Sequence, residues 1–126
     1  MYLLDTNATI DFLDNSLSPT AMQSLGNIID EQSNISIVSK MEALGFNFES
    51  QEEQNIMEAF INGSNVLDIN NEVVNRTIAI RKSKKISLPD AIIAATAINY
   101  NLILVTSNKA DFTNITGLQV LDPRSL

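Results

Sequence analysis

Four acidic residues stand at positions from which a folded chain could bring their carboxylates together. They are Asp5, Glu42, Asp90 and Asp111. An unpaired buried carboxylate is strongly disfavoured, and two like charges about 4 Å apart repel by about 4 kcal/mol at an effective dielectric near 20. Either protons or divalent cations must offset such a cluster. The composition helps to choose between these two possibilities.

The sequence contains neither histidine nor cysteine. Their absence removes the usual general base, the Ser-His-Asp and Cys-His pairs, and metal sites built on imidazole or thiolate. Any metal must then be held by oxygen, and oxygen ligands favour Mg²⁺ or Mn²⁺ over zinc or copper. Metal-activated water attacking a phosphodiester is the natural reaction of such a site.

The hydrophobic pattern predicts an alternation of strands and helices that would carry the acids. Short apolar runs predict strands at residues 2–4, 35–38, 65–69, 102–105 and 119–121. Helical spacing predicts helices near residues 7–17, 18–30, 39–44, 51–61, 73–81 and 89–100. This alternation is typical of an α/β fold with a mostly parallel sheet. The loops after parallel strands converge on one edge of the sheet, and so do the starts of the following helices, which would gather all four acids there.

Each acid also has a structural interpretation. Ser39 and Glu42 have the spacing of a capping box, in which the glutamate bonds back to the serine amide. Asp90 follows Pro89 in a first helical turn, where the helix dipole favours an acid, and Asp111 lies in a polar turn. Asp5 is harder to explain structurally. We expect Thr6 or Asn7 to cap the first helix.

Charge is unevenly distributed along the chain, which has a net charge of −7. Residues 1–72 carry 12 acids and one base, whereas residues 73–126 carry 3 acids and 7 bases. Five of these bases cluster in one segment: Arg76, Arg81, Lys82, Lys84 and Lys85. The cluster predicts a site for the phosphates of a nucleic acid, although bases near a helix C-terminus also complement the helix dipole.

Length and composition fit one globular domain spanning residues 1–126. No apolar run approaches the roughly 18 residues of a membrane span. We also expect no signal peptide, because Asp5 stands where a basic segment would be needed. Without cysteine there is no disulfide framework, so a cytoplasmic protein with no membrane partner is predicted.

Four segments, in this order and spacing, resemble the motifs of PIN-domain nucleases and, more narrowly, of VapC-type toxins from prokaryotic toxin–antitoxin pairs. The segments are residues 3–7, 37–42, 88–97 and 104–112. The first and third together are specific, the second is weak alone, and the fourth is intermediate. The resemblance implies a three-layer α/β/α sandwich around a mostly parallel sheet of four to five strands.

The resemblance also implies an Mg²⁺- or Mn²⁺-dependent endoribonuclease. Asp5 and Asp90 match the acids that hold the principal metal, Glu42 matches the second family acid, and Asp111 matches the last one. Polar residues that would orient the acids or bound water are Thr6, Asn7, Thr106 and Asn108. Implied partners are an RNA substrate, which the basic segment would contact, a cognate antitoxin and a second copy of the chain.

The sequence departs from the family pattern at one position. Many PIN domains carry their last acid two residues after the threonine of the final loop, where this chain has Asn108 and places the acid later, at Asp111. The departure leaves the number of metals open. Two other hypotheses remain: a catalytically inactive PIN scaffold that binds RNA or protein, and an aspartyl phosphatase. The second expects an acid two residues after the nucleophile, where Asn7 stands.

Overall fold

The computed structural model describes residues 1–125 and shows one parallel sheet of five strands. The strands lie in the order β3-β2-β1-β4-β5, and all four pairings are parallel. Their bounds are β1 Tyr2–Leu4, β2 Asn34–Ser36, β3 Asn65–Leu67, β4 Ile103–Val105 and β5 Val120–Leu121. The predicted α/β class with a mostly parallel sheet of four to five strands is therefore confirmed.

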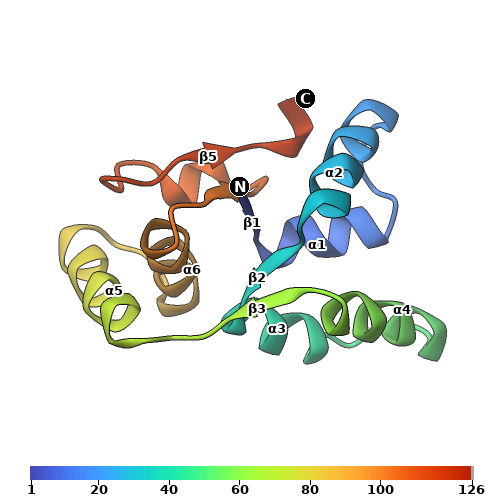
Figure 1. The fold of residues 1–126 in the computed structure, drawn as a ribbon, viewed down its shortest axis with the longest axis horizontal. Helices are drawn as coiled ribbons and strands as arrows, with labels where there is room; N and C mark the ends of the chain where they lie inside the picture. The colour runs from blue at the N-terminus through green and yellow to red at the C-terminus, as the bar shows by residue number, and fades with distance from the viewer. Residues whose placement is uncertain (126) are drawn as a thin grey trace.

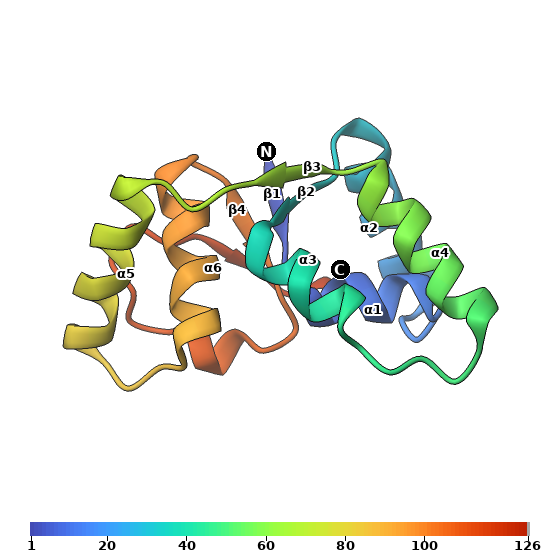
Figure 2. The ribbon, with the colours of Figure 1, turned by 90° about the horizontal axis from the view of Figure 1, so that it is seen from below.

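Helices cover both faces of the sheet, which gives the three predicted layers (Figure 1, Figure 2). On one face lie α5 Asn71–Ser83 and α6 Leu88–Asn99. On the other lie α1 Thr6–Leu13, α2 Pro19–Glu31 and α4 Gln51–Asn62. The short helix α3 Ile37–Leu44 contributes to both cores, and two 3₁₀ turns, η1 Lys109–Phe112 and η2 Pro123–Ser125, follow β4 and β5. Among residues 1–125, no helix is long and apolar enough to cross a membrane.

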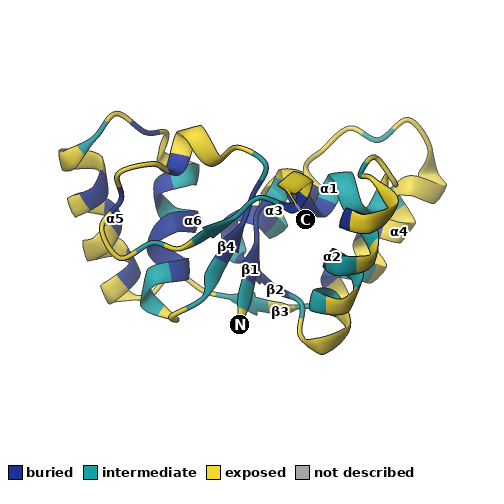
Figure 3. Cartoon of the chain, turned by 90° about the horizontal axis from the view of Figure 1, so that it is seen from above, coloured by how far each residue is buried: buried dark blue, intermediate teal, exposed yellow. Residues whose placement is uncertain are grey.

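Alternating side chains of the central strands build the two cores. Leu3 and Leu104 pack with the α5–α6 side, whereas Leu4 and Val105 pack with α1, α2 and α4. Successive strand residues point to opposite faces, so both faces of β1 and β4 are apolar because both are covered. Figure 3 shows these central strands and the inner side of α6 as the most deeply buried parts of the chain. The carboxyl ends of β1 and β4 are thereby held in a rigid frame.

The junction between β2 and α3 differs from the prediction. The strand ends at Ser36, and α3 begins at Ile37 rather than at Ser39. The Ser36 hydroxyl caps the helix by accepting a hydrogen bond from the Ser39 amide at 3.0 Å. The predicted Ser39–Glu42 capping box is therefore wrong, because Ser39 already lies inside the helix. Glu42 is left free for another role.

The first helix also begins and ends earlier than predicted. Asp5, rather than Thr6 or Asn7, is its N-cap residue. The helix ends at Leu13 because Asn15 adopts a left-handed conformation with φ of 59°, which an α-helix cannot continue. The strand after α6 begins at Ile103 instead of residue 102, because the amide of residue 102 still closes the final turn of α6.

Candidate active site

Asp5 is built into the junction between β1 and α1. It is only 4% exposed, and its amide donates to the Val105 carbonyl of β4 at 3.0 Å. One carboxylate oxygen accepts a hydrogen bond from the Ala8 amide at 2.7 Å, which is the helix-capping contact. The Thr9 hydroxyl donates to the Asp5 carbonyl at 3.0 Å. Sheet and helix together hold this side chain at the carboxyl edge of the sheet.

Burial raises the pKa of Asp5 to about 6, well above its usual value of 3.8. Hydrogen bonds from the Thr106 side chain and the Ala8 amide oppose this rise in pKa, and the negative charges of Asp90 and Asp11 add to it. A desolvated acid beside like charges lacks the counter-charge that its ionised form needs. The hydrogen bond of the helix cap stabilises the ionised form of Asp5 by less than burial destabilises it.

Asp90 lies in the first turn of α6, as predicted. Its amide donates to the hydroxyl of the N-cap residue Ser87 at 3.3 Å. Partial burial raises the pKa of Asp90, the Ser87 hydroxyl lowers it, and the charges of Asp111 and Glu42 raise it further. The negative charge of Asp90 therefore interacts with the charges of the other three acids, because it also raises the pKa of Asp5.

Glu42 reaches the site from α3 and is held there by Thr6. The Thr6 hydroxyl donates to one Glu42 carboxylate oxygen at 2.6 Å, and it lies 3.0 Å from the Ser39 hydroxyl. This contact joins residues 36 positions apart in the sequence. Thr6, which directly follows Asp5, thus holds the side chain of Glu42.

Thr106 connects Asp5 to the loop that follows β4. Its side chain is fully buried, lowers the pKa of Asp5, and accepts a hydrogen bond from the Asn108 amide at 3.0 Å. Asn108 lines the same cleft as Asp5. Asp111 lies in η1, is exposed and does not line the cleft. Its negative charge nevertheless raises the pKa of Asp90.

The acids face a small cleft of about 250 Å³. Its lining residues are Asp5, Thr6, Asn7, Ile10, Glu42, Phe46, Asp90, Ile93 and Asn108. No lysine or arginine is among them, so within residues 1–125 no basic side chain lines the cleft to neutralise the acids. Among residues 1–125, no three acids lie close enough together to form a ready cation cage. The donor set nevertheless fits Mg²⁺ or Mn²⁺, because Mg²⁺ keeps several waters and needs only one or two carboxylates.

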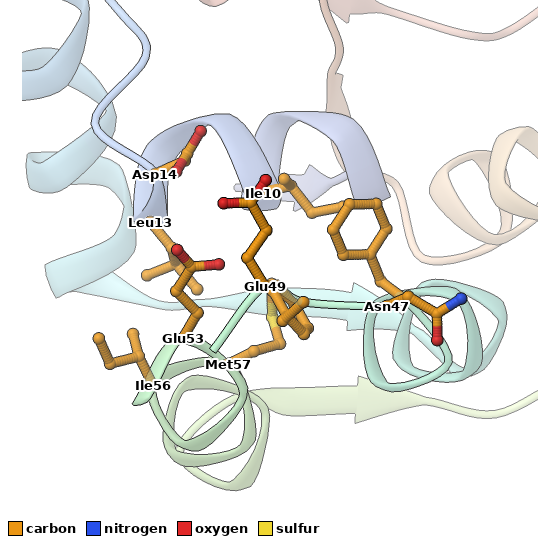
Figure 4. Close-up of a pocket in the computed structure, with 10 residues that line it drawn as sticks. Ile10, Leu13, Asp14, Asn47, Glu49, Glu53, Ile56 and Met57 are labelled. Atoms are coloured by element: carbon orange, nitrogen blue, oxygen red, sulfur yellow. The ribbon is translucent and has the colours of Figure 1, made fainter. Parts of the chain in front are cut away.

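A second, more apolar cleft of about 320 Å³ adjoins the acidic one, because Ile10 and Phe46 line both. It lies between α1, the loop after α3, and α4, and its apolar walls include Leu13, Phe48 and Met57. Asp14, Glu49 and Glu53 also line this cleft, and Figure 4 shows the side chains of Glu49 and Glu53 extending toward α1. The sequence analysis did not identify this cleft, since its walls come from three separate segments.

The predicted basic segment does not form one uniform surface. Arg76, Arg81, Lys82 and Lys85 are exposed, whereas Lys84 is partly buried and bonded to main-chain carbonyls. The sequence analysis also missed Arg124, whose guanidinium donates to the Ser107 carbonyl at 2.6 Å and pairs with Asp122 at 3.1 Å. The pairing with Asp122 raises the pKa of Arg124 and lowers that of Asp122. Two bases therefore contact the loop that follows β4.

Comparisons with known proteins agree with this architecture. The family described as "PIN domain" matches residues 2–118. One similar solved structure is a toxin–antitoxin complex from Klebsiella pneumoniae, with 28% identity, coverage of 98% of each chain and a TM-score of 0.76. Another is DNA-bound VapBC from Salmonella typhimurium, with 26% identity, 97% coverage of each chain and a TM-score of 0.81.

A third similar structure, FitAcB from Neisseria gonorrhoeae, has 23% identity, complete coverage of both chains and a TM-score of 0.74, and it supports the fold alone. No curated protein matches the sequence. The resemblance predicted from the four sequence segments is confirmed, because the family match spans nearly the whole chain and the similar structures come from toxin–antitoxin complexes. The chain belongs to the PIN domain family.

Proposed function

We propose that the protein is a VapC-type toxin that cleaves RNA as an Mg²⁺- or Mn²⁺-dependent endoribonuclease. The observation that carries the proposal is the pair Asp5 and Asp90, two desolvated acids in one cleft that no basic side chain lines. Such an arrangement is unfavourable by itself and favourable with a bound divalent cation. The similarity to chains of toxin–antitoxin complexes supports the toxin assignment.

The residues have distinct roles in this proposal. Asp5 and Asp90 would hold the cation, and Glu42, oriented by Thr6, would bind it directly or through water. The cation would activate water and stabilise the charge that develops on the phosphate. Thr106 orients the Asp5 carboxylate, and Asn108 and Asn7 bind water or phosphate oxygens. Asp111 lies outside the cleft, and its negative charge acts on Asp90.

Cleavage of RNA by the purified protein tests the proposal. We expect cleavage with Mg²⁺ or Mn²⁺, none with EDTA, and loss of cleavage in Asp5→Ala and Asp90→Ala with the fold preserved. The matched control is Asp68→Ala, because Asp68 also directly follows a strand, β3, but is exposed and lies outside the acidic cleft. Full activity in the Asp5 and Asp90 variants, or equal loss in the control, would refute this site.

An antitoxin is the proposed partner, and the apolar cleft beside the acids is its proposed docking place. Apolar walls combined with Asp14, Glu49 and Glu53 suit a partner segment that carries both apolar and basic side chains. Because Ile10 and Phe46 line both clefts, an occupant of the larger one lies next to the acids. A basic side chain from that occupant would enter the acidic cleft and exclude the cation.

Ile56→Lys tests this docking place. Ile56 lines the apolar cleft, is 46% exposed and lies outside the acidic cleft. We expect the variant to cleave RNA normally but to bind the protein encoded by the adjoining reading frame at least 10-fold more weakly, the cost of about 1.4 kcal/mol of lost contact. Unchanged affinity would place the antitoxin elsewhere and leave the nuclease proposal intact.

The alternative is an inactive scaffold that binds RNA or protein. The presence of Asp5, Glu42 and Asp90 in one cleft favours the enzyme, because a scaffold has no need for this arrangement. A thermal melt separates the two hypotheses, since only a cation site gives stabilisation by Mg²⁺ that Asp90→Ala removes. The homodimer and the cytoplasmic location remain predictions, and sedimentation equilibrium tests the first of them.

A further inference from the structure

Lys84 differs from the other bases of the predicted RNA-binding segment. Its ammonium group donates to the main-chain carbonyl of Asp111 at 3.0 Å and to that of Thr113 at 2.8 Å. These contacts span 27 and 29 positions in the sequence. Two of its three donors are therefore committed inside the protein, which leaves little capacity for binding an RNA phosphate.

The segment that Lys84 contacts is the loop that carries the outer part of the acidic site. Within it, the Asp111 amide donates to the Asn108 carbonyl at 3.0 Å, and the Asn108 amide donates to the Thr106 hydroxyl. The Thr106 side chain in turn lowers the pKa of Asp5. These contacts connect Lys84 to the loop and the loop to Thr106, which acts on the principal acid.

Both ends of this loop are held by cations from other elements. Arg124 of η2 donates to the Ser107 carbonyl at 2.6 Å, and Lys84, which caps α5, holds the far end. Phe112, 3% exposed, anchors the middle of the loop in the core. Arg124, Lys84 and Phe112 thus hold the backbone of this loop at three places. The loop, which includes Asn108 and Asp111, forms neither a strand nor an α-helix.

We propose that Lys84 is a positioning residue, which sets the place of Asp111 and Asn108 relative to the acidic cleft by holding the carbonyls of the loop. The proposal rests on the nuclease function proposed above and reassigns Lys84 from phosphate binding to organisation of the site. Charged donors make strong hydrogen bonds to carbonyls, so loss of this side chain frees the loop while leaving the two cores intact.

Lys84→Met tests the proposal, because methionine keeps the length and apolar stem of the side chain but removes its donors. We expect kcat to fall about 10- to 100-fold, the usual cost of removing a group that orients a metal site, with little change in KM. Lys84→Arg, which keeps donors for both carbonyls, should recover part of the activity. Lys85→Met is the matched control: Lys85 is exposed, and its loss should raise KM while leaving kcat unchanged.

Hydrogen exchange gives a readout that does not depend on nuclease activity. In Lys84→Met the Asp111 amide should exchange at least 10-fold faster, whereas the core amides of β1 and β4 should not change. If Lys84→Met raises only KM, as the control does, Lys84 is an RNA ligand and the positioning role is refuted. If the wild-type protein cleaves no RNA, the nuclease proposal fails, and unchanged exchange at the Asp111 amide would separately refute the positioning role of Lys84.

Discussion

Replacing Asp5 with asparagine should stabilise the metal-free protein at neutral pH. The pKa of Asp5 in the folded state, about 6, exceeds its usual value of 3.8 by about two units. Each unit corresponds to 1.36 kcal/mol, so the ionised carboxylate costs about 3 kcal/mol of folding free energy at pH 7.5. Asparagine is uncharged, keeps the shape, and retains an oxygen that can accept from the Ala8 amide.

The expected net gain is smaller than 3 kcal/mol. The new amide group needs acceptors in a site built for a carboxylate, which we expect to cost about 1 kcal/mol. The net gain of about 2 kcal/mol raises Tm by about 8 °C, because 1 kcal/mol shifts Tm by about 4 °C for a domain of this size. Asp5→Ala should gain less, since it also loses the helix cap, which is worth about 1 kcal/mol.

The sign of the pH dependence follows from the same pKa. Because folding raises the pKa of Asp5, its protonated form contributes stability that is fully present below pH 3.8 and is lost as pH rises through about 6. The advantage of Asp5→Asn over wild type should therefore appear between about pH 4 and pH 7. Mg²⁺ at ten times its Kd should stabilise wild type by about 1.4 kcal/mol and leave Asp5→Asn unchanged.

Thermal and urea melts of both proteins in EDTA, measured from pH 4.5 to 8, check these values. A wild type that is as stable as Asp5→Asn at pH 7.5, or whose stability has the same pH profile, would refute the reasoning. It would show that the fold already neutralises the Asp5 charge, and it would remove the main argument for a cation site.

Three further predictions concern Asp90, Arg124 and two glycines. Asp90→Asn should reduce cleavage at least 100-fold while raising Tm slightly, because burial raises the pKa of this acid too; activity assays and melts check both. Arg124→Met should speed exchange of the amides that follow Ser107 and lower kcat several-fold, with Arg124→Lys intermediate. Gly26→Ala should stabilise α2 by about 0.5 kcal/mol, because alanine favours a helix and its Cβ would meet the Phe12 ring at an ordinary contact distance of 3.8 Å. Gly45→Ala should destabilise the protein, because its Cβ would lie 2.9 Å from the Met41 carbonyl. Urea melts of the two variants check both predictions.

Element types followed from the sequence more closely than element boundaries did. Apolar runs flanked by polar residues located every strand, because both faces of the central strands are covered and must be apolar. The junction at residues 36–39 was misplaced because Ser36 and Ser39 are both good caps, and only the packing of Val38 into the core selects the earlier one. Local sequence carried no information about that contact.

For the site, too, the sequence indicated the types of residue more closely than their exact positions. The residue types, with no histidine or cysteine, and their places beside strand ends are enough to indicate an acidic site with oxygen ligands. The structure joins Asp5, Glu42 and Asp90 in one cleft, but it leaves Asp111 on the exposed side of η1. The position of Asp111 depends on where the loop after β4 is held, which is a matter of long-range contacts.

The sequence by itself determined the fold class, the family and the chemical character of the site, because hydrophobic period, motif spacing and donor type are local properties. Only the tertiary structure decided which groups meet. It placed Thr6 on Glu42, Thr106 between Asp5 and Asn108, and Lys84 on the loop rather than toward solvent. Each of these contacts except that of Thr106 with Asn108 joins residues far apart in the chain, and each depends on the packing of the whole domain around a common sheet edge.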